Sequence, residues 1–278
     1  MIQNSKKQRA AFSMLELIFV ITILGIVASI GSQIIAQVYE SYIVQRAQHR
    51  ATTKTELALT QIANRLRYTI PGTVVSRADI NATPPTPITD ITSTNENDKV
   101  LQWVGADGDS FEAIASDTNR KPGWSGFCDI DAYRGDTIFP TPGSDLNLTK
   151  KIIANLGGTI ANANIFFPYS TAAYGVADGV DETITLDNNL SGTTIYERYK
   201  LAWSSYALEV DANSDLILHY NFTPDIDSAI NGSSSILLHN VTNFRFMGSE
   251  GTLRIKICKW EKISEDANIT ACKEKVIF

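Results

Sequence analysis

The sequence LIFVITILGIVASI at residues 17–30 decides how the rest of this chain can be organised. No residue between Glu16 and Glu40 carries a charge. About 20 helical residues cross the roughly 30 Å hydrocarbon layer of a bilayer, and residues 17–36 supply that length. We therefore predict a membrane-spanning helix. The apolar residues of this anchor are Leu17, Ile18, Phe19, Val20, Ile21, Ile23, Leu24, Ile26, Val27 and Ile30.

Basic residues lie on one side of this apolar run. Lys6, Lys7 and Arg9 precede it, and the first eleven residues contain no acid. Basic residues that flank a membrane span stay preferentially in the cytoplasm. We therefore expect a single-pass protein with a cytoplasmic amino terminus and with the rest of the chain on the opposite side of the membrane.

Glu16 distinguishes three interpretations of this segment. A cleaved secretory signal usually has an apolar region of about 7–15 residues and no acid at its start, and this run is longer. A plain signal anchor fits the length. It leaves Glu16 unexplained, because a carboxylate beside a membrane helix is costly without a partner. The third interpretation rests on a resemblance.

The residues AFSMLELI at 11–18 resemble the class III signal of type IV prepilins. In that signal a small residue precedes the cleavage point, a phenylalanine follows it, and a glutamate stands four residues further on. The resemblance implies that a prepilin peptidase removes residues 1–11 by cutting between Ala11 and Phe12, and methylates the new amine. The family usually has glycine before the cut, where this chain has Ala11, so cleavage is expected to be slower.

The same resemblance implies how subunits assemble. Glu16 would face the Phe12 amine of a neighbouring subunit, where opposite charges in a low-dielectric bundle attract. The expected partners are the prepilin peptidase, the inner membrane, the assembly platform and other pilin or pseudopilin subunits. The expected location is the bacterial inner membrane, with the carboxy-terminal domain in the periplasm, and then a periplasmic or extracellular filament.

A helix is predicted to continue beyond the membrane span. Apolar residues recur at helical spacing up to the Pro71-Gly72 pair, which ends the pattern. One helix over residues 12–70 would be about 85 Å long at 1.5 Å per residue. The recurring residues are Val44, Ala47, Ala51, Ala58, Ile62 and Leu66, with Leu59 and Ala63 beside them.

Residues 71–278 are predicted to form a globular, antiparallel β-rich domain, which makes the fold class α+β. One sheet packed against the helix is the simplest architecture. The short sequence segments at residues 198–203 and 237–246 resemble those of the larger minor subunits of the family, namely the J-type pseudopilin and the W- or O-type minor pilins. That resemblance implies a position at or near the filament tip. The strands expected from alternating apolar residues are Val100–Val104, Tyr196–Trp203, Tyr206–Val210, Leu216–Phe222, Ser235–Leu238, Val241–Phe246 and Leu253–Cys258.

Three cysteines are too few for a disulfide-built scaffold, and none forms a C-x-x-C pair. Cys258 and Cys272 bracket a stretch that we interpret as a polar loop, Lys259 to Ala271. We favour a disulfide between them, which the resemblance supports. Two free thiols, or Cys128 as one partner, are the alternatives.

The remaining polar residues indicate no catalytic centre. His49, His219 and His239 are far apart, and no H-E-x-x-H or G-x-S-x-G motif is present. We expect a structural, non-enzymatic protein without cofactor or metal. A net charge of −6 argues against nucleic acid as a partner of the isolated subunit. An adhesin or exported binding protein on the same anchor is the alternative function.

Three acidic pairs are candidate calcium ligands, namely Asp107/Asp109, Asp129/Asp131 and Asp178/Asp181. None matches a complete calcium-binding loop, so we expect solvated turn residues. Related pseudopilins that carry calcium keep this alternative open without assigning a loop.

Overall fold

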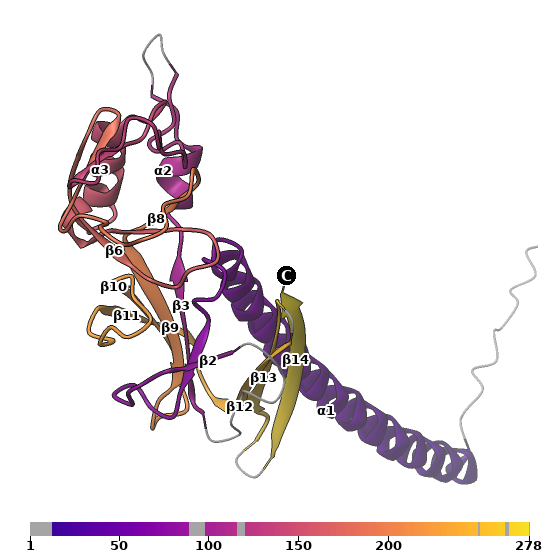
Figure 1. Ribbon diagram of the computed structural model, residues 1–278. Coiled ribbons are helices and arrows are strands. Elements are labelled where there is room, and N and C mark those ends of the chain that lie inside the picture. The colour runs from indigo at the N-terminus through magenta and orange to yellow at the C-terminus, as the bar shows by residue number, and fades with distance from the viewer. Residues whose placement is uncertain (1–12, 89–97, 116–119, 250, 265–266, 278) are drawn as a thin grey trace, which may run out of the picture.

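The computed structural model describes residues 13–88, 98–115, 120–249, 251–264 and 267–277. One long helix, α1, is joined to a domain built mainly from antiparallel strands (Figure 1). The amino-terminal half of the helix extends away from the sheets, and its other half packs against them. The predicted α+β class is therefore confirmed.

Helix α1 spans Met14–Leu66, and its 53 residues correspond to a length of about 80 Å. Its buried side chains form one stripe, as the spacing of the apolar residues predicted. Val44 is outside this stripe, because 38% of its surface is exposed. Thr55 is inside it, and its hydroxyl donates a 2.7 Å hydrogen bond to the Ala51 carbonyl. The buried residues are Ala47, Ala51, Thr55, Ala58, Leu59, Ile62 and Leu66.

The helix ends at Leu66, which is earlier than the sequence indicated. The Thr69 N–H donates to the Leu66 carbonyl, and the Ile70 N–H donates to the Val104 carbonyl on strand β3. Thr69 also forms a β-bridge with Gly105. The residues just before Pro71 thus pair with the end of the interior strand β3, and this pairing stops the helix before the proline does.

The largest sheet has six antiparallel strands in the order β11-β10-β9-β3-β1-β2. Leu101 and Trp103 of β3 and Leu208 of β9 share one apolar core with Ile62 and Leu66 of α1. This core holds the helix to the sheet. The strands are β1 (Val75–Arg77), β2 (Thr86–Pro87), β3 (Val100–Gly105), β9 (Ser204–Val210), β10 (Leu216–Phe222) and β11 (Ser233–Leu238).

A second sheet has three strands in the order β12-β13-β14, and its strands β13 and β14 also pack against α1. Its strands are β12 (Val241–Ser249), β13 (Thr252–Lys262) and β14 (Asn268–Ile277). The stretch 259–271 is therefore not a polar loop. It is the end of a hairpin, in which Lys259 pairs with Ala271.

A third sheet and its own core build the part of the domain farthest from the free helix end (Figure 1). The expectation of one sheet is thus wrong. Strands of three to seven residues with turns between them leave too little alternation to recognise in sequence. The elements are α2 (Gly108–Glu112), β4 (Ile138–Pro140), α3 (Leu146–Asn155), the 3-10 helix η2 (Ile160–Asn162), β5 (Asn164–Phe166), β6 (Tyr174–Val180), β7 (Thr183–Leu186) and β8 (Lys200–Ala202).

The strand predicted at Tyr196–Trp203 is shorter in the structure. Only Lys200–Ala202 belongs to β8. The preceding residues pair elsewhere, since Arg198 forms an isolated bridge with Phe127 and the Tyr199 N–H donates to the Gly126 carbonyl. This second pairing places residues 124–127 beside residues 198–200, and both segments line a cavity.

Candidate functional site

The first turn of α1 is built by Ser13 and Glu16. The Ser13 hydroxyl accepts a 3.3 Å hydrogen bond from the Glu16 N–H, and its carbonyl accepts from the Leu17 N–H. Ser13 is therefore the N-cap, and Glu16 places a negative charge beside the positive end of the helix dipole. The predicted cleavage residues Ala11 and Phe12 lie outside the described residues.

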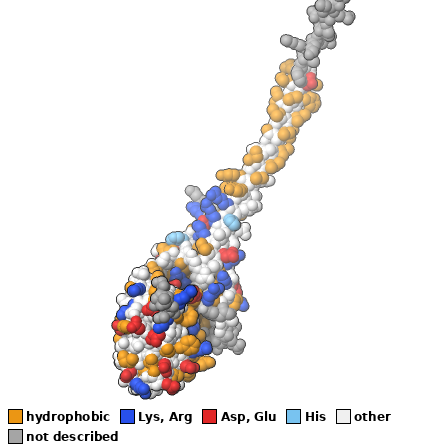
Figure 2. All heavy atoms as spheres, turned by 90° about the horizontal axis from the view of Figure 1, so that it is seen from above, with side chains coloured by type: hydrophobic (Ala, Val, Ile, Leu, Met, Phe, Trp, Pro, Cys, Tyr) orange, Lys and Arg blue, Asp and Glu red, His pale blue; other side chains and the backbone are white. Residues whose placement is uncertain are grey.

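The free half of α1 presents apolar side chains all round. Leu17 and Ile18 are each 55% exposed, and the large apolar residues that follow are also exposed as far as Tyr42. Figure 2 shows this continuous apolar sleeve beside a domain whose surface is mixed with charges. Surface of this kind in a soluble protein would be buried, so this half requires lipid or other helices around it.

Thr22 is the hydroxyl-bearing residue in the first turns of this sleeve. Its hydroxyl lies 3.0 Å from the Ile18 carbonyl and 2.9 Å from the Phe19 carbonyl. A hydroxyl that bonds to its own helix is satisfied without water. Helix α1 also has the length and hydropathy of a membrane span, and among the described residues it is the one helix that does.

The domain contains a cavity of about 880 Å³ near the carboxy-terminal end of α1. We call it the aromatic cavity, and residues from five segments line it: 67–72, 106–112, 124–127, 166–171 and 198–200. These segments are far apart in sequence. The end of α1, helix α2 and strand β8 bring them together.

Aromatic rings form a continuous chain of contacts, and five of its rings line the aromatic cavity. Phe111 at one rim is 48% exposed, and Tyr169 at another is fully exposed. Between them every ring except the exposed Tyr196 is buried, and the centroids of neighbouring rings lie 4.8 to 6.3 Å apart. The chain consists of Phe111, Trp124, Tyr199, Phe139, Phe167, Tyr196 and Tyr169.

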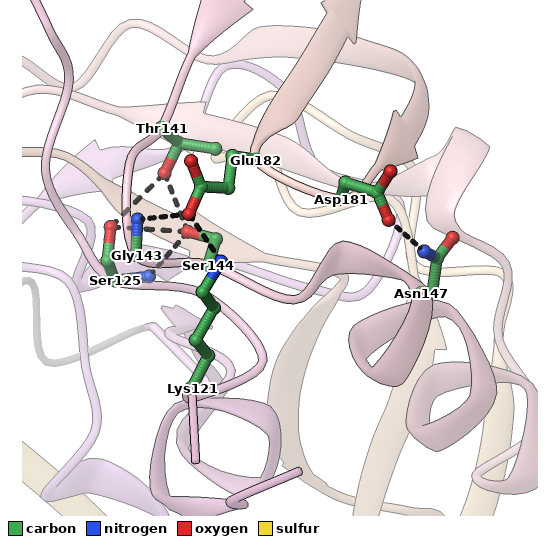
Figure 3. Close-up of polar contacts among 8 residues, drawn as sticks. All are labelled: Lys121, Ser125, Thr141, Gly143, Ser144, Asn147, Asp181 and Glu182. Carbon is green, nitrogen blue, oxygen red and sulfur yellow. Dashed lines mark hydrogen bonds and ion pairs between the residues drawn. The ribbon is translucent and has the colours of Figure 1, made fainter. Parts of the chain in front are cut away.

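A buried hydroxyl cluster adjoins this chain of rings. The Thr141 hydroxyl is 2.6 Å from the Tyr199 hydroxyl and 2.8 Å from the Ser144 hydroxyl. Ser125, which lines the aromatic cavity, joins through its own hydroxyl (Figure 3). Burial raises the pKa of Tyr199 to about 12. The cluster is therefore neutral at physiological pH and fixes the tyrosine ring.

Residues 6–32 match the family model described as the prokaryotic N-terminal methylation motif. The chain carries a prepilin-type methylation motif. The matched residues end inside the apolar sleeve of α1, and they include Ala11, Phe12 and Glu16. This agrees with a type IV pilin or pseudopilin, and it supports the expected processing by a prepilin peptidase. No curated protein and no solved structure matches the chain.

Downstream of the methylation motif, the structure contains the Cys258–Cys272 disulfide that the sequence favoured. The two residues pair directly across β13 and β14. Cys128 is a buried free thiol, and burial raises its pKa to about 11. The disulfide thus fastens the hairpin that covers α1, while Cys128 belongs to the core of the third sheet.

The carboxylates of the acidic pair Asp178/Asp181 already bind a basic group and an amide group of the same chain. The Lys150 ammonium lies 2.7 Å from the Asp178 carboxylate, and it lowers the pKa of that carboxyl. Asn147 donates to Asp181, beside the Lys121–Glu182 ion pair (Figure 3). These acids hold α3 and the loop before it to the β6–β7 hairpin.

The other two acidic pairs also serve local structure. Asp107 accepts from the Ser110 N–H as the N-cap of α2, and Asp129 accepts from the Ala132 N–H in a turn. Among the residues that the structure describes, no cluster of three or more His, Cys, Asp or Glu is placed to hold a metal ion.

The histidines do not come together. His219 contacts the Glu209 carboxylate at 2.9 Å, and His239 contacts the Asp215 carboxylate at the same distance. His49 is exposed on α1. Each histidine therefore has its own separate surroundings.

Sequence reasoning missed the aromatic cavity. The largest aromatic side chains do not mark it, because Trp103, Trp124 and Trp203 are buried. The exposed rings are phenylalanines and tyrosines instead. The clearest signal for it in the sequence is the segment Phe166-Phe167-Pro168-Tyr169, in which a proline places aromatic residues at a turn.

Proposed function

We propose that this chain is a non-catalytic minor subunit of a bacterial type IV filament, either a pilus or a type II secretion pseudopilus. The observation that carries the proposal is the methylation motif at residues 6–32, which leads directly into the exposed apolar half of α1. The motif supports a pilin-like subunit. The position at or near the tip is our inference from the large globular domain.

The two halves of α1 support this assignment. The half after Ala47 supplies the spine of the domain, whereas the half before it has no partner within the described chain. A membrane can surround the free half before assembly, and helices of other subunits can surround it afterwards. Both environments bury the same apolar surface, so transfer from one to the other need not expose it to water.

The proposal includes cleavage between Ala11 and Phe12. Mass spectrometry of the protein from the native host should find an amino-terminal N-methyl-phenylalanine at Phe12. An Ala11→Gly variant, which restores the family's usual residue, should be cleaved faster in a pulse-chase experiment. An intact leader in the assembled protein would contradict the proposal.

Glu16 has the proposed role of aligning subunits by pairing with the Phe12 amine of a neighbour. A Glu16→Ala variant should be cleaved normally but should be absent from sheared filaments. Glu40→Ala is the matched control, because Glu40 is an exposed carboxylate on the same helix at the far end of the uncharged stretch. Incorporation of both variants at the wild-type level would show that the charge pair does not guide assembly.

The proposed topology puts the amino terminus in the cytoplasm and the domain in the periplasm. The motif and the apolar helix fit a single-pass inner-membrane protein. An alkaline phosphatase fused after Phe278 should be active, because that enzyme folds only in an oxidising compartment. An inactive fusion that is expressed at full length would reverse the orientation.

An exported binding protein on the same anchor is the second candidate function. The aromatic cavity is the observation that favours it, because sites for small ligands are concave, mostly apolar and lined by a few polar groups.

A further inference from the structure

The exposed aromatic rings of the domain gather at one place. Beyond α1, the described aromatic residues with more than a third of their surface exposed are Tyr68, Phe111, Phe127, Tyr169 and Tyr196. The first four line the aromatic cavity, and Tyr196 contacts the Tyr169 ring at 6.3 Å. Contiguous exposed apolar surface of this kind marks binding sites, whereas scattered single residues do not.

Tyr169 occupies a backbone conformation that a tyrosine rarely adopts. Its φ is 63°, and the Ser170 N–H donates to the Phe167 carbonyl to close the turn. Proline precedes it, so Tyr169 has the turn position at which glycine or asparagine is usual. The Tyr169 side chain is exposed, so packing does not explain why a bulky residue has this backbone conformation. Residues with such unusual backbone angles concentrate at binding sites.

Positive charge gathers around the same rings. Arg67, Arg198 and Lys200 line the aromatic cavity, and Glu112 is the one acid among its described lining residues. In the described part of the chain no carboxylate forms an ion pair with any of the three cations. The Arg198 guanidinium lies 5.7 Å from the Phe127 ring centroid, so a cation and a ring face act together.

These charges are local, because the whole chain has a net charge of −6. A positive cavity in an acidic protein selects an anion by charge complementarity. The Glu112 carboxylate is already engaged, since it accepts a 2.8 Å hydrogen bond from the Tyr68 hydroxyl. Since Glu112 forms no ion pair with them among the described residues, Arg67, Arg198 and Lys200 can pair with the acid groups of a ligand.

We propose that the aromatic cavity binds a short anionic oligosaccharide, with its sugar rings on Tyr169, Phe127 and Phe111 and its carboxylates on Arg67, Arg198 and Lys200. A sugar ring has a flat C–H face that suits an aromatic ring and a polar edge that suits hydroxyl and amide groups. The volume of about 880 Å³ lies in the usual range for ligand sites, roughly 300–1,000 Å³. The proposal does not depend on the filament assignment.

Single-stranded nucleic acid also combines rings with negative charge, but it fits the cavity less well. Its binding proteins use a positive groove that follows the backbone over about 4–16 nucleotides. Here the three cations that the ligand would contact line one cavity, and the whole chain is acidic. The oligosaccharide is therefore the better fit, and nucleic acid is included in the test.

Calorimetric titration of the full-length chain in phosphatidylcholine nanodiscs, which contain no sugar, tests the proposal. The probe is trigalacturonate, which has three carboxylated rings, and maltotriose is the neutral control. We expect saturable binding of trigalacturonate and binding of maltotriose at least about tenfold weaker. No saturable binding of trigalacturonate, equal binding of maltotriose, or tighter binding of a hexathymidylate would overturn the proposal.

Two variants locate the site without threatening the fold. Tyr169→Gly removes the ring and suits the positive φ, so it should keep or raise the melting temperature while weakening binding at least about tenfold. Asn240→Gly is its control, because Asn240 also has a positive φ of 61° but does not line the cavity. An unchanged affinity in Tyr169→Gly would overturn the proposal.

The charge contribution is tested by Arg198→Glu. This change should weaken trigalacturonate binding by at least about tenfold, because it replaces an attraction by a repulsion. Lys256→Glu is the control, since it alters the net charge equally at an exposed position on β13, outside the cavity. Equal losses in the two variants would show that only bulk charge matters and would overturn the site.

Discussion

Cys258 and Cys272 face each other across β13 and β14, with their Cα atoms 4.0 Å apart. The hairpin they join consists of two strands of the three-stranded sheet, and both pack against α1. Anchorage of this hairpin therefore affects how firmly the helix is held to the domain.

We predict that replacing both cysteines with serine lowers the free energy of unfolding by up to about 3 kcal/mol, since the bridge closes a loop with a sequence separation of 14. Urea denaturation in detergent measures the change. Cys128→Ser is the comparison, because it keeps the disulfide. A reductant should lower its stability by as much as it lowers that of the wild type. Equal stability of the oxidised protein and the double variant would contradict this account.

Ile62 and Ile23 make a matched pair on α1, because the first is fully buried and the second is 56% exposed. Ile62→Ala should destabilise the domain by about 2–5 kcal/mol through lost burial and a residual cavity. Ile23→Ala should leave the domain's unfolding unchanged. A similar loss in both variants, measured by the same denaturation, would mean that the free half also supports the domain.

Asp107 should make stability depend on pH. Burial raises the pKa of this carboxyl from 3.8 to about 6 in the folded protein. The folded state then binds more protons than the unfolded state between these values, so stability falls as the pH rises from about 4 to 6. The shift of about 2 units corresponds to roughly 3 kcal/mol.

An Asp107→Asn variant keeps the N-cap but loses the charge. It should be more stable than the wild type at pH 8, by about 1–3 kcal/mol, and the difference should shrink toward pH 4. Asp109→Asn, at an exposed position of the same helix, should show little change with pH. A pH-independent difference for Asp107→Asn would refute the assignment.

Tyr199→Phe should weaken the buried hydroxyl cluster. The change removes a 2.6 Å contact with Thr141 and should cost about 1–2 kcal/mol of unfolding free energy. Tyr133→Phe is the comparison, because its hydroxyl donates to the Asp136 carbonyl at an exposed site and accepts a longer, 3.3 Å hydrogen bond from the Leu190 N–H, so its removal should cost less. In thermal denaturation, the melting temperature of Tyr199→Phe should therefore be lower than that of Tyr133→Phe.

The strands differ in how well the sequence predicted them. The strand predicted at Leu216–Phe222 has the observed bounds of β10, because apolar and aromatic residues dominate this run. Burial alternates along strand β14, but Lys273 and Lys275 occupy its helix-facing positions. Their ammonium groups lie 3.7 Å from Glu56 and 3.5 Å from Thr60 on α1. Long stems can cover apolar surface while their charges find partners, so the pattern looks polar in sequence.

The sequence by itself determined the amino-terminal helix, its apolar half and the methylation motif. These depend on composition and local spacing, since roughly 20 uncharged residues suit a membrane whatever the rest of the chain does. The stripe on the second half of α1 also followed from helical periodicity.

Only the tertiary structure decided the division into three sheets and the aromatic cavity. Tyr68 and Tyr169 are separated by a hundred residues, and no local pattern indicates that they line one cavity. Their proximity results from the early end of α1 and from the pairing of residues 126–128 with residues 197–199. Contacts between distant segments depend on the packing of the whole domain, and for that reason the sequence specified the anchor more clearly than the site.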